Sequence, residues 1–210
     1  MPAQNMRIRA EQLGYWYLRL NGFLTIPNFI VHPEQGRNQE TDVDILAVRF
    51  PYRAELRTMQ DDQPFTRISG KSFIALAEIK SKVCALNGPW TNPDRQNMHK
   101  VLRAVGAFPA AENEIAAAAL YERGFYQSQL YHTSLLCLGE EESPEVATNY
   151  PKMPQMTWFK ALSFIYTRFD SYRRQKESHG QWDEQGRALW VVSEQSRSSQ
   201  EFVDRVGVVG

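Results

Sequence analysis

The stretch 72-SFIALAEIKSKV-83 decides the fold, because it combines an apolar strand with two charges that a buried strand does not need. Its first half is β-compatible and almost continuously apolar, which predicts a strand that is covered on both faces. Glu78 and Lys80 stand two positions apart, so on a strand both side chains project from the same face. A carboxylate and an ammonium on one face of such a strand indicate a polar site rather than plain core.

A second stretch, 41-TDVDILAVRF-50, repeats this pattern on the preceding predicted strand. Asp42 and Asp44 again share one strand face. Two neighbouring strands that each place carboxylates on one face gather like charges, which is costly unless a cation lies among them. Mg²⁺ suits one or two carboxylates together with water and a phosphate, and Lys80 adds a compact positive charge. The chemistry that this pattern favours is metal-assisted attack of water on a phosphodiester.

The flanking segments place these two strands in an α/β order. We expect four helices and five strands in all, with a polar loop at 32–40 and an excursion at 51–70 between the strands that flank them. The expected elements are a helix at 4–21 that Gly22 ends, strands at 23–32, 41–50 and 71–83, helices at 92–105 and 110–123, a strand at 125–139, a helix at 157–176 and a strand at 188–193. This order predicts an α/β sandwich around a mixed sheet. It corresponds to one domain over 1–193, with its core at about 5–138 and a C-terminal helix and strand at about 157–193, and a flexible tail at 194–210.

Composition excludes several classes of protein. The chain has 24 basic and 24 acidic residues, so no global positive field attracts nucleic acid. It has no apolar run of membrane-spanning length and no signal-peptide pattern, so we expect no membrane partner. Cys84 and Cys137 form no zinc-like spacing or disulfide framework, and we expect a reducing, cytoplasmic location. Any grip on nucleic acid must therefore come from local patches or from another subunit.

The two charged strands resemble the active-site signature of the PD-(D/E)xK nuclease superfamily, which includes many restriction endonucleases and archaeal-type Holliday-junction resolvases. The matching segments are D-I-L-A-V from Asp44 and L-A-E-I-K-S from Leu76, preceded by Glu11 on the first predicted helix. Glu11 lies eleven residues before a Gly-Phe pair that leads into the first strand, as a glutamate does in many members. The resemblance covers about residues 7–106 and implies a restriction-endonuclease-like α-β-β-β-α-β core with a mixed central sheet flanked by helices.

The resemblance also implies roles for individual residues. Asp44 and Glu78 would be metal ligands, joined by the Ile79 carbonyl oxygen, and the cofactor would be Mg²⁺ or Mn²⁺. Lys80 would orient the nucleophilic water or stabilise the developing charge, and Glu11 would complete the metal shell directly or through water. The substrate would be a nucleic acid, most often DNA, cut to leave a 5′-phosphate.

Two departures from the family pattern concern the first acidic residue. The sequence reads E-T-D where the pattern has a proline, and the gap from Asp44 to Glu78 is longer than in compact members. Asp42 is a second candidate ligand, although D-I-L-A after Asp44 matches better. For Asp42 a cap at the strand entry is an equal alternative. For Glu11 the alternative is an exposed helix residue.

Two groups of basic side chains are candidate contacts with a nucleic-acid backbone. They are Arg95 and Arg103, with His99 between them at helical spacing, and Arg173 and Arg174 in the densest basic run. A solvated helix face for the first group, and a favourable interaction with a helix C-terminus for the second, explain them more simply. Trp90, in the loop N-G-P-W-T-N-P, either stacks on a base or packs on the core.

The sequence leads to a metal-dependent endonuclease that acts on DNA as a homodimer or as a subunit of a larger DNA-processing or defence complex. A catalytically silent nuclease-like module that binds nucleic acid or scaffolds a complex is the alternative. A third interpretation is an internal carboxylate–lysine ion pair in an unrelated α/β protein. Stabilisation by a divalent ion separates this last interpretation from the first, because an internal ion pair does not bind the ion.

Overall fold

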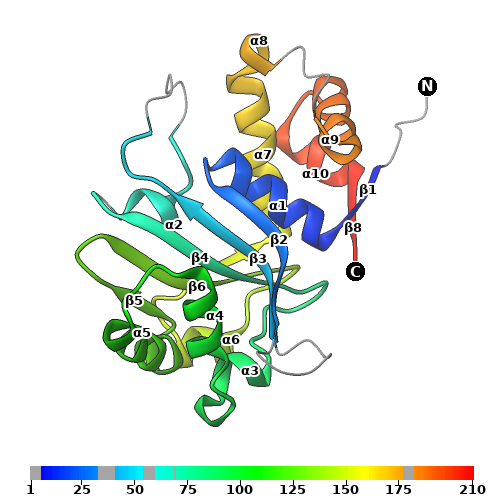
Figure 1. The fold of residues 1–210 in the computed structure, drawn as a ribbon. Helices are drawn as coiled ribbons and strands as arrows, with labels where there is room; N and C mark the ends of the chain where they lie inside the picture. Colours follow the sequence, from blue (N-terminus) through cyan, green and yellow to red (C-terminus); the bar gives the residue numbers. More distant parts are fainter. Residues whose placement is uncertain (1–5, 33–40, 54–59, 69, 177–181) are drawn as a thin grey trace.

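A mixed sheet lies at the centre of the protein (Figure 1). The computed structural model describes residues 6–32, 41–53, 60–68, 70–176 and 182–210. Within them the sheet has six strands in the order β2-β3-β4-β6-β5, and β7 pairs with the end of β6. The strands are β2 (Leu24–Val31), β3 (Thr41–Arg49), β4 (Ser72–Ile79), β5 (Phe125–Gln127), β6 (Tyr131–Gly139) and β7 (Gln155–Thr157).

Strand direction changes at β4. Strand β3 pairs antiparallel with both β2 and β4, whereas β6 lies parallel to β4. A parallel neighbour needs a crossover, and the helices between β4 and β6 provide it. Every residue of β4 after Ser72 is buried, as the apolar run predicts for a strand covered on both faces. The predicted α/β class with a mixed central sheet flanked by helices is confirmed; its restriction-endonuclease-like identity stays a prediction.

Helices cover both faces of the sheet (Figure 1). One layer packs on the side that Ile45, Ala75 and Ala77 face, and the other on the side that Leu46 and Leu76 face. The first layer contains α1 (Ala10–Leu20), α7 (Trp158–Ser171), α9 (Glu184–Gln195) and α10 (Ser199–Arg205). The second contains α3 (Gly88–Thr91), α4 (Asn97–Val105), α5 (Ala110–Arg123) and α6 (Pro144–Asn149). Short helices α2 (Gln63–Thr66) and α8 (Arg173–Lys176) complete the fold.

Helix α1 approaches the sheet closely at Gly14. A Cβ atom at this position would lie 2.8 Å from Ile79 Cδ1, which is closer than real Cβ atoms come, and 3.2 Å from Ile45 Cδ1, which is a tight contact. The absence of a side chain therefore lets α1 pack directly on β3 and β4. This contact fixes the helix that carries Glu11 against the ends of the two strands that carry Asp44 and Glu78.

The C-terminal region differs from the prediction. The segment 188–193, predicted as a strand, is helical and belongs to α9, and the tail predicted at 194–210 forms α10 and β8 (Val206–Val209). An apolar run such as A-L-W-V-V fits either period, and here the helix begins at the N-cap Asp183, whose side chain accepts from the Gly186 N–H. Strand β8 pairs in parallel with β1 (Met6–Arg9), so the two ends of the chain form a small second sheet.

Several element boundaries also differ. The first helix begins at Ala10, because Met6–Arg9 is the strand β1; residues 4 and 5 of the predicted helix lie outside the described residues. Asn92 caps the short 3-10 turn η1 (Pro93–Arg95), and α4 begins only at Asn97. The predicted strand at 125–139 is the antiparallel pair β5 and β6. The predicted helix at 157–176 is divided into α7 and α8, and residues 33–40 of the predicted loop lie outside the described residues.

Among the described residues no helix is both long enough and apolar enough to cross a membrane. Cys84 and Cys137 are buried free thiols.

Candidate functional site

The candidate site lies where β3 and β4 stop pairing with each other. Their last paired residues are Ile45 and Ala77. Beyond this pair the Asp44 side chain replaces the backbone ladder, because the Ile79 N–H donates to Asp44 Oδ2 at 2.7 Å. Asp44 thus sits at the end of the paired region beside Glu78, as the two sequence motifs predict.

Glu78 is a buried carboxylate that is held by three donors. Only 4% of the residue is exposed. Its Oε1 accepts from Lys80 Nζ at 2.5 Å and from Asn87 Nδ2 at 2.6 Å, and its Oε2 accepts from Trp90 Nε1 at 2.8 Å. Lys80 Nζ also donates to Asn87 Oδ1 at 3.1 Å, so these three polar groups form a closed ring. Glu78 and Lys80 therefore do share a strand face, and their charges meet directly.

Asn87 and Trp90 are site residues that the sequence motifs do not identify. Asn87 precedes α3, a one-turn helix with proline at its second position, and this turn carries Trp90 back against the sheet. Trp90 is 3% exposed, so it packs on the core rather than stacking on a base in solution. Its one polar atom donates to Glu78. The only signal in the sequence is that a Gly-Pro turn follows E-x-K closely enough to fold back over it.

The electrostatics of Asp44 show which predicted residues surround it. Burial raises the pKa of the Asp44 carboxyl, and the charges of Asp42 and Glu11 raise it further. The Ile79 N–H and the Lys80 ammonium oppose this change without cancelling it. The pKa of Glu78 is raised in the same way, first by burial and then by Asp44, against hydrogen bonds from Lys80 and Trp90. The site therefore holds more negative charge than its own cation neutralises.

Glu11 lies at the start of α1, on the Asp44 side of the sheet end. Its Oε2 is buried, and no hydrogen-bond donor among the described residues reaches it; the nearest cation is Arg9, whose Nε lies 3.6 Å away. Asp42 is exposed at the edge of the site. Both predicted acids are thus near Asp44, but neither contacts it.

A divalent ion fits this donor set in part. Among the described residues, no three acidic, histidine or cysteine side chains are close enough to hold a metal ion by themselves. Mg²⁺, however, is usually held by one or two carboxylates and completes its shell with water and substrate oxygens. Asp44, with its raised pKa, and Glu11 Oε2, which accepts no hydrogen bond among the described residues, are oxygen ligands of this kind. The role of the Ile79 carbonyl oxygen stays a prediction; its N–H is occupied by Asp44.

The structure does not bring the four candidate nucleic-acid arginines onto one surface. Arg95 lies on η1, outside α4, with its guanidinium beside Gly88 of α3 and hence close to the site. Arg103 on α4 pairs with Glu114 at 3.1 Å. Arg173 pairs with Asp170 at 3.2 Å, and with Arg174 it belongs to α8, at the opposite end of the molecule from α3 (Figure 1). Of the four, Arg95 alone is placed beside the candidate site.

The segment after β8 contacts the residue that follows Lys80. The last residue, Gly210, lies against Ser81, which directly follows Lys80; a Cβ atom on Gly210 would be 2.7 Å from Ser81 Cβ. Pairing of β8 with β1 holds it there. The sequence motifs gave no sign of this contact, because the two segments are separated by most of the chain.

Comparisons of this chain with protein-family models, with curated proteins and with solved structures found no match. Interpretation of the site therefore depends on its own geometry and on the two motifs.

Proposed function

We propose that this protein is a metal-dependent endonuclease that hydrolyses phosphodiester bonds in DNA. One observation carries the proposal. A buried Glu78 is fixed beside an incompletely neutralised Asp44 where β3 and β4 stop pairing, and Lys80 donates to the carboxylate of Glu78. Perturbed acids beside a lysine are typical of a catalytic site, and the resemblance to the PD-(D/E)xK signature names the reaction.

Each residue has a definite task in this proposal. Asp44 and Glu78 present carboxylate oxygens, and Glu11 adds a third close by. A bound Mg²⁺ or Mn²⁺ would neutralise phosphate charge and lower the pKa of a water. Lys80 has a side chain that is 23% exposed, so its ammonium can leave Glu78 to orient the water or to meet the charge that develops on phosphate. Asn87 and Trp90 are positioning residues that fix the rotamer of Glu78.

Substrate binding needs more positive charge than the described residues place around the site. The net charge of the chain is zero, and Arg95 is the one candidate arginine near Glu78. Tight binding to a DNA backbone normally uses several phosphate contacts. We therefore propose that the protein cuts DNA as a homodimer or beside a second, basic subunit.

The test uses the full chain with three substrates: supercoiled plasmid, single-stranded DNA and a branched junction, each with Mg²⁺, Mn²⁺ or EDTA. We expect metal-dependent cleavage that Asp44→Asn and Lys80→Ala abolish. Asp204→Asn is the matched control, because Asp204 is an exposed carboxylate on α10 that contacts Gln200. Its rate should equal that of the wild type.

The alternative, a catalytically silent module, is favoured by one observation. Glu78 already has three donors and a lysine partner, so it needs no metal to be satisfied. A thermal-shift measurement with Mn²⁺ distinguishes the two proposals. No cleavage and no shift would reject the metal-dependent nuclease, whereas a shift that Asp44→Asn removes, without cleavage, would indicate a nuclease that requires a partner.

A further inference from the structure

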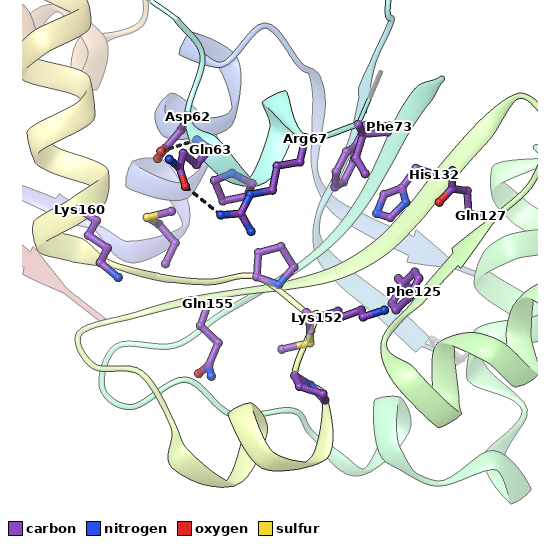
Figure 2. A pocket seen from close by; sticks show the side chains of 16 residues that line it. Asp62, Gln63, Arg67, Phe73, Phe125, Gln127, His132, Lys152, Gln155 and Lys160 are labelled. Atoms are coloured by element: carbon purple, nitrogen blue, oxygen red, sulfur yellow. Dashed lines mark hydrogen bonds between the residues drawn. The ribbon is translucent and has the colours of Figure 1, made fainter. Parts of the chain in front are cut away.

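A cavity lies away from the candidate site, beneath α2 and beside β5 and the start of α7 (Figure 2). Its volume is about 770 Å³. Phe73, on its wall, projects from the face of β4 opposite to Glu78, because the two positions differ by an odd number of residues. The proposed nuclease chemistry makes no use of this cavity.

One wall of the cavity is a stack of flat rings. The His132 ring lies 4.8 Å from Phe73 and 5.8 Å from Phe125, and it is nearly parallel to Phe125. His132 is 9% exposed, and its Nδ1 has no hydrogen-bond partner among the described residues. Burial, together with the nearby Lys71, lowers the pKa of His132 to about 4, so the ring is neutral at pH 7. This wall therefore offers uncharged aromatic surface that another flat ring can pack against.

The rest of the lining has an excess of positive charge. Arg67, Lys152 and Lys160 line the cavity, against a single lining carboxylate, Asp62. Both Asp62 oxygens accept hydrogen bonds from within the protein, Oδ2 from the Tyr17 hydroxyl at 2.7 Å and Oδ1 from the Gln63 N–H at 2.8 Å. Both oxygens of Asp62 are thus already used by donors within the protein.

Two of these cations have no carboxylate partner among the described residues. Lys160 pairs with Glu142 at 2.6 Å. Arg67 instead donates to the neutral amide of Gln63 at 3.0 Å, and the Lys152 ammonium lies 5.7 Å from the centre of the Phe125 ring. In Figure 2 Lys152 extends toward Phe125, so an uncompensated positive charge borders the ring stack. An anion that enters the cavity meets both kinds of surface.

We propose that this cavity binds a small anion that carries a flat aromatic ring, of the class of a nucleoside monophosphate. The ring would stack against Phe125 and His132, and the phosphate would lie between Lys152 and Arg67. Amide side chains of Gln63, Gln127 and Gln155 in the lining can hydrogen-bond the edge of a base. The volume is in the range of natural small-molecule sites. This binding is independent of phosphodiester cleavage.

Isothermal titration calorimetry of the full chain with AMP tests the proposal, with adenosine and inorganic phosphate as separate titrants. EDTA is present throughout, so that no metal ion at Asp44 can hold the phosphate. We expect AMP to bind with a Kd below about 1 mM and each half-ligand to bind at least about tenfold more weakly, because each contacts only one kind of surface. Arg67→Gln, Lys152→Gln and Phe125→Ala should each weaken AMP binding by about tenfold.

Lys82→Gln is the control, because Lys82 is an exposed lysine that pairs with Glu140 far from the cavity; its AMP affinity should be unchanged. Circular dichroism confirms that each variant is folded. Absence of AMP binding by the wild type up to millimolar concentration would overturn the proposal. So would AMP binding that survives both cation substitutions, or phosphate binding as tight as AMP binding.

Discussion

Two carboxylate centres near opposite ends of the paired region of β3 and β4 are neutralised in opposite ways. Asp61, beside Arg49 at one end, has a side chain that is 4% exposed, and it pairs with three guanidinium groups, those of Arg49, Arg53 and Arg168. Burial alone would raise the pKa of Asp61, but hydrogen bonds and charge from these arginines bring it below its ordinary value. At the other end of the paired region, Asp44 accepts one backbone hydrogen bond, and its pKa is raised.

This difference separates a charge that holds the fold from a charge that is available for chemistry. The arginines of Asp61 come from β3, from the segment that follows it and from α7, so the carboxylate ties two layers together. Asp44 and Glu78 share one lysine between them. Incompletely neutralised buried acids destabilise a fold, and a protein retains them where an exchangeable cation or a substrate supplies the missing charge.

The largest expected effect is on the Asp61 centre. Asp61→Asn keeps the size of the side chain but leaves three guanidinium groups without their carboxylate. Removing one partner of a buried ion pair costs about 3–5 kcal/mol, so we expect the melting temperature to fall by at least about 6 °C. Thermal unfolding followed by circular dichroism measures this, and Asp204→Asn is the exposed control. A fall of less than about 2 °C would show that the arginines find other partners.

A smaller effect concerns the donor that holds Glu78. Trp90→Phe removes the N–H that reaches Glu78 Oε2 but keeps an aromatic ring in the core. If the site is catalytic, the cleavage rate should fall by about 10- to 100-fold, the usual cost of losing a group that orients a metal ligand. Trp16→Phe is the matched control, because Trp16 Nε1 donates to Asp183 at 3.2 Å in the α9 cap.

Trp90→Phe should lose about 1–2 kcal/mol of stability, because the buried Glu78 Oε2 is left without its donor. Trp16→Phe should lose less, because Asp183 is exposed and its Oδ1 still accepts from the Gly186 N–H. Only Trp90→Phe should change the rate. Equal rates in the two variants would mean that Glu78 needs no fixed rotamer, and would weaken its assignment to the site.

Asp44→Asn should stabilise the protein in the absence of metal. The amide oxygen still accepts the Ile79 N–H, while the charge that Glu78, Asp42 and Glu11 repel is removed. We expect a gain of about 0.5–2 kcal/mol, which is the range for relieving a strained functional site, together with loss of cleavage. Mn²⁺ should raise the melting temperature of the wild type and leave that of the variant unchanged. A destabilised variant would place Asp44 with Asp61 as a structural group.

The predictions that succeeded are those that depend on neighbours along the chain. The apolar run from Phe73 to Ala77 is sufficient to predict β4 as a buried strand, and strand alternation puts Glu78 and Lys80 on one face. The pairing of β8 with β1 joins residues two hundred positions apart, and no local pattern specifies it. The run A-L-W-V-V at 188–192 fits both the strand and the helix period, and the close packing of α9 on Trp16, where Gly186 leaves no room for a side chain, is a tertiary contact that the sequence does not reveal.

The candidate site follows the same division between local patterns, which the sequence reveals, and tertiary contacts, which it does not. Its charged residues belong to two strand motifs, so their convergence follows from sheet pairing. Asn87 and Trp90 reach Glu78 only because the loop after β4 turns back, and this depends on how α3 packs. The basic residues were the weakest inference, since helical spacing places Arg95 and Arg103 on one face only if a single helix carries both.

The smallest expected effect is a difference in pH dependence between the two centres. Asp44 has a folded-state pKa above its unfolded value, so the folded state binds its proton more tightly, and wild-type stability declines relative to Asp44→Asn as pH rises from about 4 through the raised pKa. Asp61 has a folded-state pKa below its unfolded value, so its contribution is present at neutral pH and is lost as pH falls below about 4. Urea unfolding of the wild type and of both asparagine variants between about pH 3.5 and about pH 7 brackets the usual carboxyl pKa of about 4. For each site we subtract the free energy of unfolding of the variant from that of the wild type. This difference should fall with increasing pH for Asp44 and rise for Asp61. Slopes of the same sign would mean that both carboxylates are neutralised alike, and the distinction between a structural and a chemically available charge would then fail.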